Sequence, residues 1–185
     1  MIAILAAAIV LAQEAMITAP PAPPPPAAAP APPPSPKAAS ATPGDLSTAP
    51  PLPNGFLAPV ARDEAGETFL VIDRAARVGG SADFWTYEVF TPPIMIKEGL
   101  FVVQGLTHHL SDCDAKTDQR VASAGYDEAG APVVALAAGP PHPLEAGGPY
   151  ALIARALCAG RTPPKDGATQ GHAAALAEAR APAAG

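Results

Sequence analysis

Asp83-Phe-Trp-Thr-Tyr-Glu-Val-Phe90 is the stretch of sequence that decides the fold. Aromatic and β-branched residues dominate it, and both kinds favour an extended strand, in which successive side chains point to opposite faces. The even-numbered side chains from Phe84 to Phe90 therefore share one face, and the odd-numbered ones from Trp85 to Val89 share the other. Trp85 is the only tryptophan of the chain. Because such a side chain can bury about 150–250 Å², we expect it to anchor the core.

Four more strand patterns surround this stretch. They lie at residues 68–73, 100–110, 120–126 and 131–137. Turn residues separate them: Gly79-Gly80-Ser81 precedes Asp83, Pro92-Pro93 should end the strand that starts there, and Asp127–Gly130 fits a hairpin turn. Short strands with turns at this spacing are typical of an antiparallel meander.

A helical pattern follows the last strand. Pro149 suits the first position of a helix, and Gly160 can end it. Between them, an apolar stripe at helical spacing is formed by Leu152, Ile153, Ala156 and Leu157. We therefore predict an α+β domain at residues 56–160, an antiparallel β-sheet of about five to six strands with a C-terminal helix packed on it.

The segments on either side of this domain have a different composition. Proline is 26 of 185 residues, and 15 of these prolines lie between Pro20 and Pro53. Because proline lacks an amide donor and has a fixed φ, we predict a disordered Ala/Pro-rich linker at residues 13–55. Three roles fit it: a spacer, a ligand for a proline-binding groove, or a linker without a partner. Residues 161–185 are rich in Ala, Gly and Pro. Ala173 to Ala181 could form a short helix, but its apolar content is nearly all alanine, so we predict a disordered tail at 161–185.

The N-terminus has the pattern of an export signal. Ile2 to Ala12 form an unbroken apolar run, which is shorter than the about 20 residues that a membrane-spanning helix needs. Small residues suit cleavage before Gln13, although no Lys or Arg precedes the run. We therefore predict a signal peptide at residues 1–12 and an exported protein (periplasmic, at the cell surface or secreted) with no stable membrane span after cleavage. An uncleaved, poorly inserted anchor is the alternative.

The predicted domain carries all of the net charge of the chain, which is −6 at neutral pH. Residues 54–160 contain 13 acidic and 7 basic side chains. This acidic balance excludes a basic nucleic-acid-binding protein and disfavours an anionic membrane surface as a binding partner. We expect a protein partner in the envelope or the extracellular space and no nucleic acid.

The chain has two cysteines, Cys113 and Cys158, and each lies at the end of a predicted element. An even count in an exported protein favours a disulfide. On the chain-entropy model, closing the loop between them would stabilise the fold by roughly 4 kcal/mol. The alternatives are a catalytic thiol or a metal ligand.

One dense group of metal-ligand residue types consists of His108, His109, Asp112, Cys113 and Asp114. Adjacent strand residues point to opposite faces, so the two histidines cannot easily share a metal, and a disulfide would remove Cys113. A nucleophilic pair of Cys113 and His109 would need a free thiol. We expect a solvated, partly packed edge of the sheet here and predict no metal site.

Two further groups of charged residues lack a complete catalytic or metal motif. Asp73, Arg74 and Arg77 are expected to form a surface salt bridge rather than an acid–base pair. The three aspartates between 112 and 118 lack the glycine and the bidentate glutamate of a calcium loop. The sequence contains no GxSxG, HExxH or P-loop pattern, so we predict no catalytic residues and no cofactor.

Several short motifs occur together between residues 68 and 158. They are Val71-Ile72-Asp73 with Arg77, Phe84-Trp85, Asp112-Cys113 with Arg120, Tyr126–Gly130, and the segment from Pro149 to Cys158. In this order they resemble the bacterial surface-adhesin protein E-like domain family. The resemblance implies a secreted or surface α+β domain with an antiparallel sheet, a helix and a structural disulfide. The adhesin that gives the family its name binds host extracellular-matrix proteins, whereas this chain has no lipoprotein cysteine and carries the long Ala/Pro tract.

These observations favour an exported, non-enzymatic binding or interaction domain of the bacterial cell envelope. A structural component of an envelope-associated assembly is the alternative. A periplasmic metal-binding protein or enzyme is a third hypothesis.

Overall fold

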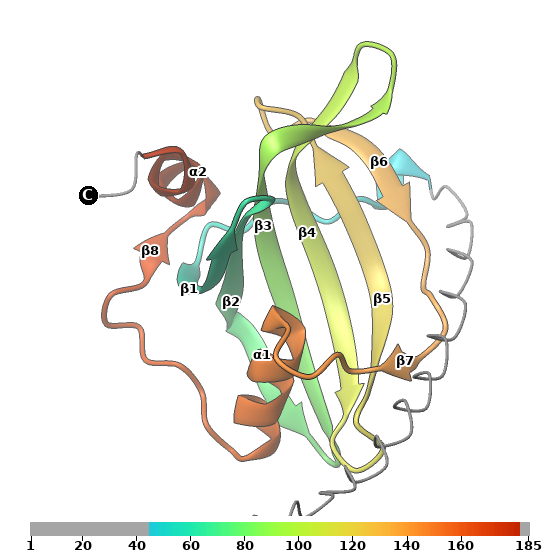
Figure 1. Ribbon diagram of the computed structural model, residues 1–185, viewed down its shortest axis with the longest axis vertical. Helices are drawn as coiled ribbons and strands as arrows, with labels where there is room; N and C mark the ends of the chain where they lie inside the picture. The colour runs from blue at the N-terminus through green and yellow to red at the C-terminus, as the bar shows by residue number, and fades with distance from the viewer. Residues whose placement is uncertain (1–44, 182–185) are drawn as a thin grey trace, which may run out of the picture. The chain divides into compact units, whose positions relative to one another are not determined.

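The computed structural model describes residues 45–181, and the fold is reported for that part of the chain (Figure 1). The predicted signal peptide and the linker up to residue 44 lie outside the described residues. Within 45–181 the chain forms one antiparallel sheet of eight strands, together with two α-helices. The predicted antiparallel sheet with a helix is confirmed, but the sheet has more strands than predicted and a second helix is present.

The sheet is a meander for most of its width. Its strands are β1 (Phe56–Asp63), β2 (Gly66–Val78), β3 (Ser81–Lys97), β4 (Leu100–Asp112), β5 (Thr117–Tyr126), β6 (Pro132–Leu136), β7 (His142–Pro143) and β8 (Thr169–Gln170). The strand order is β6-β5-β4-β3-β2-β1-β8, and β7 pairs with β5 outside that path. The sequence patterns did not indicate β1, β7 and β8. β1 contains Pro59, beside which its register with β2 shifts, and the other two are two residues long.

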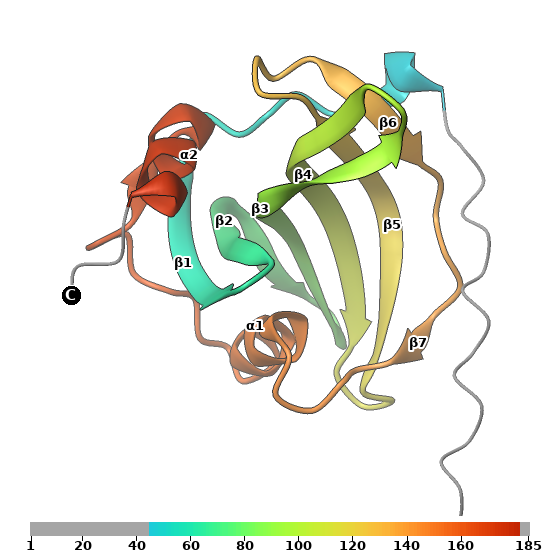
Figure 2. The ribbon, with the colours of Figure 1, turned by 45° about the horizontal axis from the view of Figure 1, so that its top comes forward.

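Two α-helices and two core clusters lie on opposite faces of the sheet. Helix α1 (Pro149–Cys158) contacts β2 and β3 and packs Ile153 and Leu157 against Phe84. Helix α2 (His172–Arg180) follows β8 and packs Ala175 in the cluster that contains Tyr87 (Figure 2). Phe84 and Tyr87 differ by an odd number of positions in β3, so their side chains leave the strand on opposite faces.

Two details of this packing correct the sequence-based expectations. The fully buried aromatic side chains are Phe69, Phe84 and Tyr87, whereas Trp85 is only partly buried. In α1 the residue at position 152 is exposed and the buried face consists of Ala151, Ile153, Ala154 and Leu157. Small alanines allow the helix to approach the sheet closely, which turns the larger Leu152 outward.

The prediction of a disordered tail from residue 161 is wrong for its described part. Residues 169–180 contain β8 and α2, and Ala175 is fully buried. The Arg62 guanidinium donates to the carbonyl oxygens of Glu178 and Ala179, at 3.1 and 2.8 Å, which ties the end of α2 to β1. The alanine-rich helix is therefore held by contacts with the sheet and not by an amphipathic pattern of its own.

The described part of the predicted linker, residues 45–55, also belongs to the folded domain. Asp45 caps the short 3₁₀ helix η1 (Leu46–Thr48), and Leu52 packs against the core cluster of Tyr87. The Tyr126 hydroxyl donates to the carbonyl oxygen of Pro50. The boundary predicted at residue 56 is therefore too late.

The predicted disulfide between Cys113 and Cys158 is present. Cys113 directly follows β4 and Cys158 is the last residue of α1, so the bond fastens the helix to one end of the sheet. Neither α-helix between residues 45 and 181 is long and apolar enough to cross a membrane.

Candidate functional site

Strands β3 and β4 continue beyond the rest of the sheet as a two-stranded hairpin, which Figure 1 shows extending from the body of the domain. The last pair between β2 and β3 is Gly66 with Phe90, and the last pair between β4 and β5 is Gln104 with Tyr126. Residues 91–101, which we call the projecting hairpin, therefore have strand partners only in β3 and β4, although the Thr91 amide also donates to the carbonyl oxygen of Ala65.

The prediction that Pro92-Pro93 ends the strand is wrong. β3 continues to Lys97, with a shift in its register to β4 between Val89 and Ile94. Prolines interrupt a central strand because they remove amide donors from its ladders. Here β2 has already ended, so the missing amides break no ladder on that side.

The projecting hairpin exposes an unusual number of large apolar side chains. Ile94, Met95, Ile96 and Phe101 are 42–64% exposed, and they make up half of the exposed large apolar residues in the described chain. Its only charged residues, Lys97 and Glu98, have opposite signs. Contiguous exposed apolar surface marks interaction sites in soluble proteins. The apolar run from Ile94 to Ile96 is visible in the sequence, but the prolines before it were expected to end the strand.

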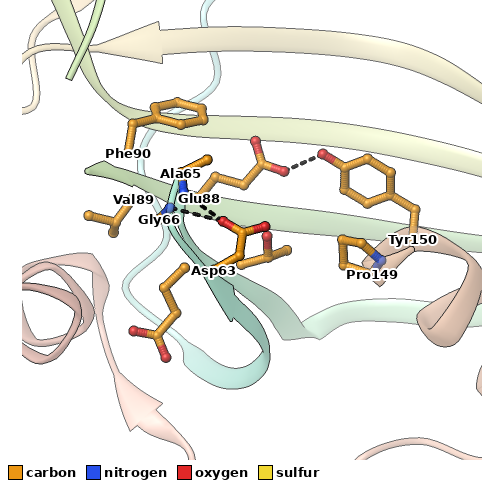
Figure 3. Close-up of a pocket in the computed structure, with 10 residues that line it drawn as sticks. Asp63, Ala65, Gly66, Glu88, Val89, Phe90, Pro149 and Tyr150 are labelled. Atoms are coloured by element: carbon orange, nitrogen blue, oxygen red, sulfur yellow. Dashed lines mark hydrogen bonds between the residues drawn. The ribbon is translucent and has the colours of Figure 1, made fainter. Parts of the chain in front are cut away.

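A cavity of about 200 Å³ lies at the root of this hairpin. The turn between β1 and β2, the last residues of β3 before the hairpin and the first residues of α1 form its walls (Figure 3). Gly66 brings the turn close to β3, since a Cβ atom at this position would lie 1.9 Å from the carbonyl oxygen of Val89. The polar side chains in the cavity wall include Asp63, Thr68, Glu88 and Tyr150.

Glu88 and Tyr150 form a partly buried polar pair in this cavity. The Tyr150 hydroxyl donates to Oε1 of Glu88, as the dashed line in Figure 3 shows. Burial raises the pKa of Glu88 above its ordinary value, and the Tyr150 hydroxyl partly opposes this by stabilising the carboxylate. Burial also raises the pKa of Tyr150, and the neighbouring Glu88 carboxylate raises it further. The phenol is therefore a hydrogen-bond donor at neutral pH.

His109 lies in a buried row of polar side chains next to Tyr150, not at the solvated edge that the sequence predicted. It is 3% exposed, and its ring stacks on Phe84 with centroids 5.0 Å apart. Its Nδ1 is 2.8 Å from Oδ2 of Asp118 and its Nε2 is 3.2 Å from the hydroxyl of Thr86. The Ser111 hydroxyl donates to the other Asp118 oxygen at 2.6 Å.

A hydroxyl, a histidine and an aspartate in this order are the groups of a nucleophilic triad. Here Thr86 has no exposed surface, so a substrate could not reach its hydroxyl. Burial opposes ionisation of Asp118, but the hydrogen bonds from His109 and Ser111 keep its pKa below the ordinary value. The sheet thus holds a charged carboxylate whose two oxygens both accept hydrogen bonds, and we assign this row a structural role.

The other residues of the sequence group from His108 to Asp114 are dispersed. His108 lies on the opposite face, stacked on Trp85 at 4.6 Å between centroids and 2.7 Å from Asp83. Asp112 accepts from the backbone amides of Asp114 and Ala115 and stabilises the turn after β4. Among residues 45–181, no three His, Cys, Asp or Glu side chains are grouped so that they could hold a metal ion.

The expected salt bridge of Asp73 with Arg74 and Arg77 is also absent from the described part of the chain. Asp73 instead pairs with Lys165 at 2.7 Å, Arg74 lies over the Trp85 ring, and Arg77 donates to the carbonyl oxygen of Gly79. No sequence pattern indicated Lys165, because it lies in the segment that we predicted to be disordered.

Comparison with family models, with curated proteins and with solved structures finds no match to this chain.

Proposed function

We propose that this chain is an exported, non-enzymatic binding domain of the bacterial cell envelope, similar in role to surface-adhesin E-like proteins, and that it binds a protein partner through the projecting hairpin. The observation that carries the proposal is the group of exposed apolar side chains at Ile94, Met95, Ile96 and Phe101. The disulfide supports export, because such bonds persist in oxidising compartments.

Two properties of the hairpin favour a protein over a membrane as its partner. Beyond Thr91 its outer edges have no strand partner within residues 45–181, so their backbone amides and carbonyls are available to an added strand. Lys97 and Glu98 cancel in charge, and the chain as a whole is acidic, so anionic lipids gain no electrostatic attraction. The partner that we expect therefore has an apolar groove that ends in an exposed strand edge.

Site-specific photo-crosslinking in the producing cells tests this proposal. A photoreactive phenylalanine analogue replaces Met95 in the full chain, and a matched probe replaces Leu110, which is exposed at the far end of β4. We expect one protein to crosslink from position 95 and not from position 110. That crosslink should disappear when Ile94→Ser and Phe101→Ser are added to the position-95 chain.

Three results would overturn the proposal. They are equal crosslinking from positions 95 and 110, crosslinking from position 95 to lipid, and crosslinking only to a second copy of the chain. In each case, circular dichroism of the purified variants confirms that the domain has folded.

A further inference from the structure

The cavity at the root of the projecting hairpin has acidic walls without a basic side chain. Asp63, Glu67 and Glu88 line it, and none of its lining residues is Lys, Arg or His. Glu67 is compensated elsewhere, because its carboxylate lies 3.3 Å from the Arg62 guanidinium. Asp63 and Glu88 have no such cation in the cavity.

Glu88 is the less compensated of the two. Its Oε1 accepts from the Tyr150 hydroxyl, whereas its Oε2 accepts no hydrogen bond within residues 45–181 and keeps some contact with solvent. A buried carboxylate is usually paired with a cation or satisfied by several donors, because ionisation in a desolvated site is costly. The Tyr150 phenol and the neighbouring His109 ring offset this cost only in part, because the pKa of Glu88 is still raised.

Gly105 keeps space open beside this carboxylate. It faces Glu88 across β3 and β4, and a Cβ atom here would lie 3.1 Å from the Phe90 ring and 3.5 Å from Oε2 of Glu88. The glycine therefore allows the Phe90 ring to lie over β4. The cavity combines a carboxylate with the aromatic rings of Phe90 and Tyr150, and a cation can interact favourably with both kinds of group.

We propose that this cavity binds a primary ammonium group on an apolar stem, the chemistry of a lysine side chain. An ammonium interacts as a compact point charge and needs one free carboxylate oxygen, which Glu88 offers. A guanidinium is bound best by both oxygens of one carboxylate, and one of those is already occupied by Tyr150. The proposal is independent of the proposed function, because the cavity does not include the exposed side chains of the projecting hairpin.

Titration of the full, oxidised chain with n-butylammonium chloride, followed by ¹H–¹⁵N NMR, tests the proposal. We expect saturable shifts at the amides of Glu88, Phe90 and Tyr150. Glu88→Gln keeps the size of the side chain and an acceptor for Tyr150 but removes the charge, and it should weaken binding at least about tenfold. Glu145→Gln, which changes an exposed carboxylate outside the cavity, should leave binding unchanged.

A second variant keeps the test decisive if Glu88→Gln does not fold. Asp63→Asn lies at an exposed turn and retains the oxygen that accepts from the amides of Ala65 and Gly66, and we expect roughly threefold weaker binding. The proposal is overturned if n-butanol produces the same shifts, if neither cavity variant weakens binding, or if the folded protein shows no saturable shifts. Tighter binding of N-propylguanidinium than of n-butylammonium would overturn the choice of ligand class.

Discussion

Strands β3 and β4 are neighbours over most of their length, but the two halves of this pair have different surroundings. Within the sheet, Phe84 and Thr86 have no exposed surface and His109 has almost none. In the projecting hairpin, Ile94, Met95 and Phe101 face solvent. The residue types of a strand therefore do not fix its role. The same kinds of side chain stabilise the fold where other strands flank them and remain available for binding where none does.

The largest expected effect is a difference in stability between variants of two phenylalanines, Phe84 in β3 and Phe101 in β4. Phe84→Ala should lower the free energy of unfolding by about 3–5 kcal/mol, because it leaves a cavity between the sheet and α1. Phe101→Ala should change it by less than about 0.5 kcal/mol, because the side chain is exposed. Guanidinium denaturation followed by tryptophan fluorescence measures both values. Similar losses for the two variants would show that the projecting hairpin contributes to the core.

The second prediction concerns the disulfide, which fastens the end of β4 that lies away from the projecting hairpin. Replacing both Cys113 and Cys158 by Ala should lower the free energy of unfolding by about 2–4 kcal/mol. Hydrogen exchange should increase most in α1, which loses its covalent link to the sheet. An unchanged denaturation midpoint, or faster exchange mainly in the hairpin, would contradict this assignment. Reduction of the wild-type protein with dithiothreitol provides the matched control.

These contrasts also show which parts of the molecule the sequence could predict. The strand patterns between residues 68 and 137 led to the correct meander, because alternation along a strand is a local property. The packing of helix α2 could not be predicted in this way, since Ala175 is buried by contacts with residues far away in the sequence. The cavity at the root of the hairpin depends on Glu88 and Tyr150, which are 62 positions apart and share no local pattern.

The third prediction compares two threonines of β3. Thr86→Val keeps the shape of the side chain but leaves Nε2 of the buried His109 without its partner, so it should cost about 1–2 kcal/mol. Thr91→Val, at the exposed start of the projecting hairpin, should have an effect below about 0.5 kcal/mol. Urea denaturation of the two variants gives the comparison. An equal cost at both positions would show that the polar row around His109 does not contribute to stability.

The smallest expected effect is a difference in the pH dependence of stability between variants of two glutamates, Glu88 in β3 and Glu98 at the tip of the projecting hairpin. Burial raises the pKa of Glu88 in the folded state, so the folded protein binds this proton more tightly than the unfolded chain does. The stability associated with the protonated form is present below the pKa of the unfolded chain, about 4.3 for a glutamate, and is lost as the pH rises through the folded pKa. Glu88→Gln removes this titration, so its free energy of unfolding relative to wild type should increase between pH 4 and 7.

Denaturant midpoints of wild type and variant at several pH values in this interval provide the measurement. The opposite sign belongs to Asp118, whose pKa is lowered and whose stabilising contribution is lost as the pH falls through its folded pKa, so values above pH 4 separate the two groups. Glu98→Gln at the tip of the projecting hairpin is the control, because that side chain is exposed before and after unfolding. If the free energies of unfolding of Glu88→Gln and wild type differ by the same amount at every pH, the Glu88 carboxylate is as well stabilised in the fold as in water. The contrast between the two halves of β3 would then be limited to their apolar residues.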